Sequence, residues 1–136
     1  MELEEYKKKI QEVLSTPLST DSPENLYKES ALIESMAYIA VRQAALMETK
    51  IANLNEILRD EKAKALPTLS GNQLEKTIKI EALVSSTLKA IDEAETTMKY
   101  WKSVGKLIEN KVSLSQSILA NITSQIKANL YLENIK

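Results

Sequence analysis

The 136-residue sequence contains no cysteine, no histidine and no phenylalanine, and it has only two glycines and three prolines. Without cysteine there is no disulfide framework, no thiol nucleophile and no thiolate metal site. Without histidine there is no imidazole ligand, no Ser–His pair and no side chain that ordinarily titrates near neutral pH. Most catalytic chemistry is therefore excluded, and we expect a protein that is not an enzyme and that needs no cofactor and no metal.

Long apolar runs are also missing. No stretch approaches the roughly 18 apolar residues that a membrane-spanning helix requires. The first residues, MELEEYKKKI, form a charged helix start rather than an apolar signal core. The lack of cysteine fits a reducing compartment. We expect a soluble protein of the cytoplasm with no membrane partner.

Helix-forming residues dominate what is present, chiefly Ala, Leu, Ile, Lys and Glu. The stretch STPLSTDSP cannot remain helical, whereas Ser22 followed by Pro23 is the pattern of a helix start. A second boundary follows Pro67, where we expect Asn72 to cap the next helix and Glu75 to complete a capping box. The sequence therefore predicts an all-α chain with one helical domain. Its predicted parts are an N-terminal helix over 1–15, a linker over 16–22, a long helix over 23–65, a turn over 66–72 and a long helix over 73–133.

Apolar residues in both long helices recur at alternating spacings of four and three. A 3.5-residue period sustained over many turns specifies a coiled-coil seam. The short connection then makes the two helices antiparallel neighbours, so we predict a long antiparallel hairpin. Polar residues on the seam, Thr87 and Ser115, with Gln116 beside it, are predicted to set either its register or the number of subunits. The seam positions are Ile33, Ala37, Ala40, Ala44, Met47, Ile51, Leu54 and Leu58, then Ile80, Val84, Thr87, Ile91, Ala94, Met98, Trp101, Gly105, Ile108, Val112, Ser115, Leu119, Ile122 and Ile126.

Further apolar residues lie off the seam, where a two-helix hairpin leaves them in water. An extended apolar surface of this kind marks an interface. We therefore predict an obligate homo-oligomer whose contacts lie toward the C-terminus. The alternative is that the N-terminal helix folds back and covers the off-seam residues. The residues predicted for oligomerisation are Leu114, Ile118, Ile122, Ile126 and Leu130.

Five cations flank the predicted turn, and we name them the basic corner: Arg59, Lys62, Lys64, Lys76 and Lys79. Repeated around an oligomer, such a set forms a basic track able to follow a phosphate backbone. The alternative is structural, because cations near a helix C-terminus favour the macrodipole by about 0.3–1 kcal/mol each without any ligand.

Aromatic residues beside a second basic face suggest a contribution to single-strand binding, since bases stack on aromatic rings. Lys99, Lys102 and Lys106 share one helix face next to Tyr100 and Trp101. Trp101 falls on the seam and is predicted to be core, so Tyr100 is the stacking candidate.

The sequence from about Leu26 to Leu132 resembles the UvsY recombination mediators of T-even-type phages. The resemblance rests on the order and length of the helices, on the Lys62–Lys64 motif before a turn with Ser-Gly, and on the Tyr100–Trp101 step two dozen residues into the second helix. Lys64 stands where that family prefers arginine.

The resemblance implies a non-enzymatic, ring-forming homo-oligomer that binds single-stranded DNA. Such a mediator helps to load a RecA-like recombinase onto DNA covered by single-strand-binding protein. The family's basic motif falls on Lys62 and Lys64, and its aromatic step falls on Tyr100 and Trp101. The alternative interpretation is a non-catalytic structural protein, adaptor or assembly chaperone of a phage, in which the same helices serve only protein contacts.

Overall fold

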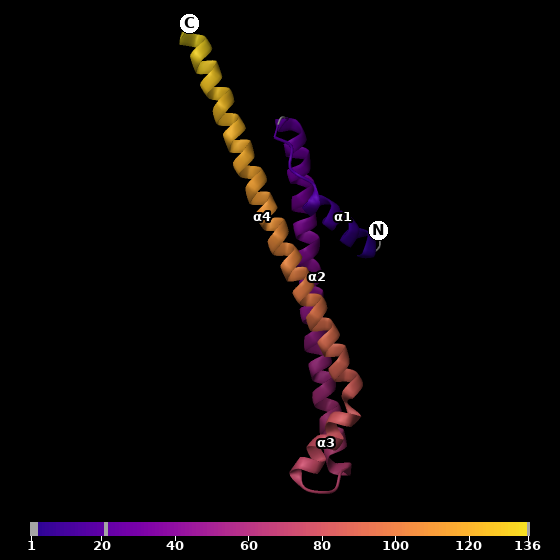
Figure 1. Cartoon of the computed structure of the whole chain (residues 1–136). Coiled ribbons are helices and arrows are strands. Elements are labelled where there is room, and N and C mark those ends of the chain that lie inside the picture. The colour runs from indigo at the N-terminus through magenta and orange to yellow at the C-terminus, as the bar shows by residue number, and fades with distance from the viewer. Residues whose placement is uncertain (1–2, 21, 136) are drawn as a thin grey trace. The chain divides into compact units, whose positions relative to one another are not determined.

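The computed structural model describes residues 3–20 and 22–135 (Figure 1). The first two positions of the predicted 1–15 helix, position 21 of the predicted linker and residue 136 lie outside the described residues. Within the described part the chain is all-α, with no strand, which confirms the predicted class. The elements are α1 (Leu3–Ser15), α2 (Pro23–Ala65), the short 3-10 helix η1 (Leu66–Thr68), α3 (Gln73–Leu83) and α4 (Ser85–Ile135).

The ends of helix α2 follow from local chemistry. The Ser22 hydroxyl accepts a hydrogen bond from the Asn25 amide over 3.3 Å, and Pro23 occupies the first helical position. Proline is favourable there because the first amides of a helix have no intrahelical partner. At the other end α2 gives way to η1, whose second residue is Pro67. Helix α2 spans the same residues as the predicted helix.

The turn after η1 requires one glycine. Gly71 has φ of 114°, and a Cβ placed on it would lie 2.2 Å from Glu75 Oε2. The Asn72 side chain accepts a hydrogen bond from the Glu75 amide over 2.9 Å, which is the N-cap contact predicted for this helix. Position 71 therefore favours glycine because of its conformation, which L side chains rarely adopt, whereas the Glu75 carboxylate lies at the end of a flexible side chain that can move away.

The predicted helix over 73–133 is interrupted at Val84, which ends α3 and precedes α4. Val84 has φ of −101° and ψ of 12°, outside the helical region. Its amide still bonds to the Ile80 carbonyl, and its carbonyl still accepts from the Leu88 amide, both over 3.0 Å. The prediction of one unbroken helix was wrong at this residue. No glycine or proline marks the break in the sequence; a serine pair follows it instead.

The chain divides into two compact units, the first comprising residues 1–40 and 103–136 and the second residues 41–102. In the first unit the Ser30 hydroxyl donates to the Ser115 hydroxyl over 2.8 Å, and a Cβ on Gly105 would lie 3.7 Å from the Ala40 Cβ. In the second unit the Thr87 hydroxyl donates to Glu61 over 2.6 Å. Thr87 and Ser115, the polar seam positions, thus both have partners on α2.

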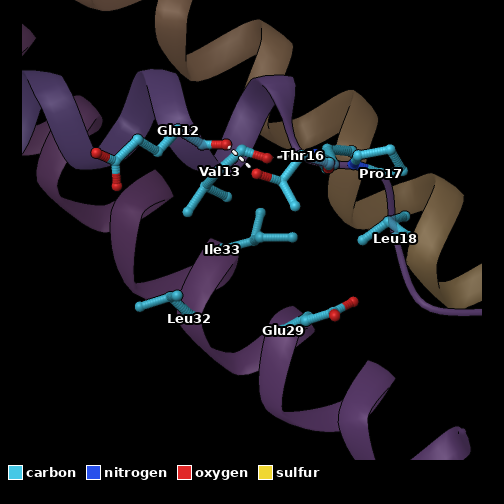
Figure 2. A pocket seen from close by; sticks show the side chains of 9 residues that line it. Glu12, Val13, Thr16, Pro17, Leu18, Glu29, Leu32 and Ile33 are labelled. Carbon is cyan, nitrogen blue, oxygen red and sulfur yellow. Dashed lines mark hydrogen bonds between the residues drawn. The ribbon is translucent and has the colours of Figure 1, made fainter.

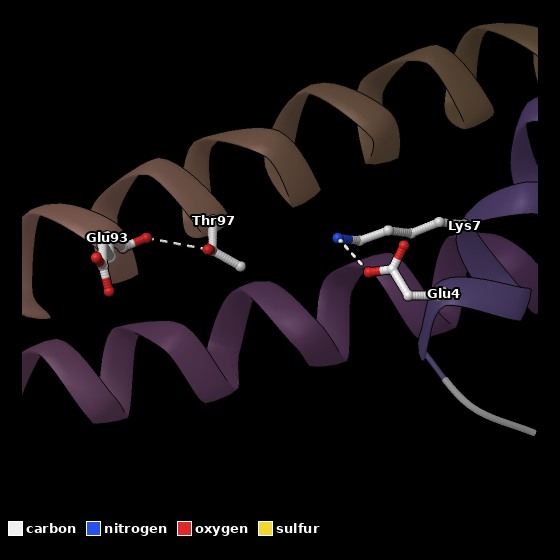
Figure 3. A network of polar contacts seen from close by, with 4 residues as sticks. All are labelled: Glu4, Lys7, Glu93 and Thr97. Carbon is white, nitrogen blue, oxygen red and sulfur yellow. Dashed lines mark hydrogen bonds and ion pairs between the residues drawn. The ribbon is translucent and has the colours of Figure 1, made fainter.

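Burial follows the predicted seam spacing. Every seam position from Ile33 to Leu58 and from Ile80 to Ile122 is buried or half-buried. Exposed faces carry local contacts, such as the Lys7–Glu4 ion pair of 3.4 Å within α1 and the Thr97 hydroxyl donating to the Glu93 carbonyl over 3.0 Å within α4 (Figure 3).

The off-seam apolar residues remain uncovered. Eight large apolar residues of the long helices were predicted off the seam; seven of them are exposed, and the eighth, Ile118, is half-buried. Helix α1 buries only Ile10 fully, so the alternative in which the N-terminal helix covers these residues is wrong. The exposed seven are Leu32, Ile57, Leu83, Leu107, Leu114, Leu130 and Leu132.

Candidate functional site

Helix α2 presents three cations of the basic corner on its last two turns. Arg59, Lys62 and Lys64 are all exposed. Since successive residues of an α-helix are about 100° apart, Arg59 and Lys62 lie about 60° apart around the axis. By the same geometry Lys62 and Lys64 lie about 160° apart. The two lysines of the family-like motif therefore project from nearly opposite sides of α2 rather than from one face.

Helix α3 presents the other two cations. Lys76 is half-buried, and Lys79 is exposed and donates a hydrogen bond to the Ser70 carbonyl over 3.1 Å. This contact holds Lys79 against the turn that precedes α3. Helix α3 buries no residue, so the side chains of its outer face are in contact with water.

The electrostatics of the basic corner are those of an open, mixed surface. Asp60, Glu61 and Glu75 lie among the five cations in sequence, and Glu61 accepts the hydrogen bond from Thr87. Among the described residues there is no group of three acidic side chains positioned to hold a metal ion. Exposed ammonium and guanidinium groups of this kind can contact phosphates without reading base sequence.

Tyr100 is not part of the basic corner. Thirteen residues separate it from Thr87, the residue of α4 that contacts Glu61, which corresponds to ~20 Å along the helix. Tyr100 is half-buried and its ring meets the buried Trp101 ring edge-on, with centroids 5.2 Å apart and planes at 76°. Nearby, Lys102 forms an ion pair of 3.1 Å with Glu48. The structure thus separates the stacking candidate from the five cations.

The C-terminal end of α4 extends beyond the part that faces α2. Ten residues along α2, from Ala40 to Ser30, correspond to ten residues along α4, from Gly105 to Ser115. Counted on at the same one-to-one spacing, the first residue of α2, Pro23, corresponds to Ile122. We name residues 123–135 the α4 extension; all its described side chains are exposed.

The residues predicted for oligomerisation are on this end of α4 but are not equally accessible. Ile118 and Ile122, which lie along the part that faces α2, are half-buried. The exposed fractions are 55% for Leu114, 50% for Ile126 and 55% for Leu130.

Charge is almost absent from the same end, a feature that the sequence analysis overlooked. Residues 112–126 contain no charged residue, and Lys127 is the single charge between Lys111 and Glu133. Solvent-facing helix surfaces normally carry charges, whereas the centres of protein interfaces are depleted of them. This end of α4 therefore combines exposed isoleucine and leucine with almost no charge.

A further arrangement that the sequence analysis missed lies at the end of α1. The Lys111 ammonium donates to the carbonyls of Val13, Leu14 and Thr16. In the following linker, the Ser19 amide and hydroxyl donate to the two carboxylate oxygens of Glu29 over 3.0 and 2.7 Å. These contacts join residues that are not neighbours in sequence, so no local pattern predicts them. The one hint in the sequence is that the last turn of α1 has no basic residue of its own to interact with its carbonyls.

A cavity of about 240 Å³ lies between the end of α1, the linker and α2 (Figure 2). Its walls are mainly apolar, with Ile33 directed from α2 toward Val13 and Thr16 of the α1 end. Packing beneath the linker is therefore incomplete. The lining residues are Glu12, Val13, Thr16, Pro17, Leu18, Glu29, Leu32, Ile33 and Lys111.

Comparison of the chain with protein-family models, with curated proteins and with solved structures finds no match. Across residues 3–20 and 22–135, no helix combines the length and the apolar character that crossing a bilayer demands. The functional interpretation therefore rests on the geometry above and on the resemblance of the sequence.

Proposed function

We propose that this protein is a non-catalytic, self-associating recombination mediator whose basic corner binds single-stranded DNA. In this proposal it helps to load a RecA-like recombinase onto DNA covered by single-strand-binding protein, in the cytoplasm of the host cell. The observation that carries the proposal is the exposure of Arg59, Lys62, Lys64 and Lys79, four of the five cations of the basic corner. The absence of histidine and cysteine from the sequence supports a role without catalysis.

The proposed architecture is an antiparallel pairing of the long helices. Two contacts support it within the second unit. On α2, Glu48 comes before Glu61, whereas on α4 the partner of Glu48, Lys102, comes after the partner of Glu61, Thr87, so the two helices run in opposite directions. Within the first unit, the contact of Ser30 with Ser115 and the approach of Ala40 to Gly105 also support helices that run in opposite directions.

Self-association is proposed through the α4 extension, and its partner is a second copy of the chain. The seam spacing of Leu119, Ile122 and Ile126 continues past the point where α2 begins, so a further helix of the same kind is needed to cover it. Lack of charge over residues 112–126 supports a protein partner rather than water.

The presence of one weak basic corner on each subunit of an oligomer supports the DNA-binding part of the proposal. Asp60 and Glu61 leave each basic corner with only a modest positive excess. Several corners on one strand raise the overall affinity because binding at the second corner becomes intramolecular. Such binding is insensitive to base sequence and falls steeply as salt is added.

A second candidate function, a structural adaptor or assembly chaperone, is favoured by one observation. Lys62 and Lys64 are separated by about 160° around α2, so a single strand cannot lie on one face of this helix and contact both directly. In an adaptor these lysines act only as cations at a helix end.

Titration with a labelled oligothymidylate over a series of salt concentrations separates the two candidates. A DNA-binding mediator gives saturable binding whose logarithmic affinity falls linearly with the logarithm of the salt concentration. An adaptor gives no saturable binding at low salt.

A further inference from the structure

The end of α1 lies across an apolar stripe of α4. Leu107, Lys111, Leu114 and Ile118 are spaced by four, three and four residues, so they share one face of the helix. Leu107 is 54% exposed and Leu114 is 55% exposed. Between them, the Lys111 ammonium holds the α1 end through the carbonyls of Val13, Leu14 and Thr16.

A groove of about 480 Å³ shows that this contact is incomplete. It is bounded on one side by the α1 end and the linker, and on the other by the stripe of α4. The α1 end therefore sits on the stripe without filling the surface around Leu107 and Leu114. The groove is lined by Leu14, Ser15, Thr16, Pro17, Leu18, Leu107, Asn110, Lys111 and Leu114.

Helix α1 depends on few anchors. Ile10 is its single fully buried residue, and a helix of 13 residues is marginal on its own in water. In its last turn the Glu12 carbonyl accepts from the Ser15 and Thr16 hydroxyls, whereas the carbonyls of Val13 and Leu14 accept from Lys111. Helix α1 supplies no basic residue of its own there. Lys111 supplies both the donors and the positive charge that this helix end favours. Removal of Lys111 therefore loosens α1 without removing any apolar contact of the seam.

We infer that α1 is a latch over the self-association surface of α4 and that Lys111 is its clasp. This inference rests on the self-association proposed above. Leu107 and Leu114 are both exposed with α1 docked, but the α1 end crosses the stripe between them at Lys111. A helix of a second copy therefore cannot lie along both leucines while α1 is docked. Release of α1 opens the stripe from Leu107 into the α4 extension, and it strengthens association.

Substitution of Lys111 tests the latch in the full chain. Lys111→Met keeps the aliphatic stem and removes the ammonium, Lys111→Arg keeps a cation, and Lys106→Met is the matched control, because Lys106 is exposed on α4 outside the stripe. Hydrogen exchange reports the release of residues 3–15, and sedimentation velocity over a concentration series reports association. In Lys111→Met we expect α1 exchange and the association constant each to rise by roughly fivefold to thirtyfold. Lys111→Arg and Lys106→Met are expected to behave as the wild type.

A second variant releases α1 from its other anchor. Ile10→Ser weakens the buried contact while leaving Lys111 in place, and it should raise exchange and association in the same direction. If both variants free α1 and association is unchanged, the latch inference is overturned while the proposed self-association stands. If Lys111→Met leaves α1 exchange as in the wild type, Lys111 is not the clasp and the inference is also overturned. If the wild type and both variants sediment as monomers at every concentration, the proposed self-association fails and the latch fails with it.

Discussion

The hydroxyl of Ser30 donates a hydrogen bond of 2.8 Å to the hydroxyl of Ser115, across the buried seam between α2 and α4. Ser115 in turn donates to the Val112 carbonyl over 2.7 Å. Both serines are buried, so each hydroxyl depends on this short chain of hydrogen bonds rather than on water. A buried polar pair of this kind penalises any register that separates its members.

Ser115→Ala is expected to destabilise the fold by about 1–3 kcal/mol, because it leaves the buried Ser30 hydroxyl without its acceptor. The double variant Ser30→Ala/Ser115→Ala should recover much of that loss, since no buried hydroxyl is then left over. Urea denaturation of the wild type, the two single variants and the double variant measures the coupling. Additive losses in the double variant would contradict a direct partnership.

Lys62→Ala/Lys64→Ala is expected to weaken binding to single-stranded DNA and to reduce the slope of logarithmic affinity against logarithmic salt by about 0.7, the share of one phosphate contact, because a strand on one face of α2 contacts only one of the two lysines directly. The reason is that each lysine that contacts a phosphate releases condensed counterions. Fluorescence anisotropy across a salt series makes the measurement. Lys8→Ala/Lys9→Ala is the matched control, because it removes two exposed lysines from α1. Equal effects of the two double variants would show that only overall charge matters.

Tyr100→Ala is expected to leave the affinity for single-stranded DNA nearly unchanged. Tyr100 lies ~20 Å along α4 from the residue that contacts the end of α2, and its ring packs edge-on against Trp101. Edge-to-face pairs contribute about 0.5–1.5 kcal/mol beyond the area that they bury, so the expected effect is on stability. Thermal unfolding and DNA titration of the same preparation separate the two properties. A large loss of affinity without a change in stability would make Tyr100 a stacking residue after all.

Ile126→Lys/Leu130→Lys is expected to dissociate the oligomer while leaving the fold of each chain intact. Both side chains are already exposed within one chain, so charge there disturbs only a contact with another copy. Multi-angle light scattering gives the mass, and circular dichroism gives the helicity. Val41→Lys/Leu46→Lys, at two exposed positions of α2, is the matched control and should keep the wild-type mass. If only the control variant dissociated, the interface would lie on α2 and the prediction for α4 would be wrong.

The sequence predicted those features that local chemistry determines. Ser22 and Pro23 mark the start of α2, and Asn72 marks the start of α3, because capping groups and proline act on their own neighbours. The seam spacing predicted most of the buried side chains of the long helices, since the helical period selects one face. It did not predict the burial of Leu26, Met36 and Val104, and Ile126, a seam position, is exposed.

Features that depend on distant contacts, and a helix break that no residue type marks, were missed. The break at Val84 keeps the backbone hydrogen bonds on either side, so it requires neither glycine nor proline, and the sequence carries no residue that predicts it. The contact of Lys111 with the α1 end joins positions more than ninety residues apart, which no local pattern reveals. The divergence of Lys62 and Lys64, by contrast, was available from their spacing of two and was overlooked.

Co-sedimentation of the wild-type protein with a long labelled oligothymidylate at low salt tests the central claim most directly. The account predicts that the protein sediments as a homo-oligomer without DNA, that the labelled strand moves with this oligomer, and that both the complex and its salt sensitivity diminish in Lys62→Ala/Lys64→Ala. A monomer that leaves the strand at the velocity of free DNA would contradict the account.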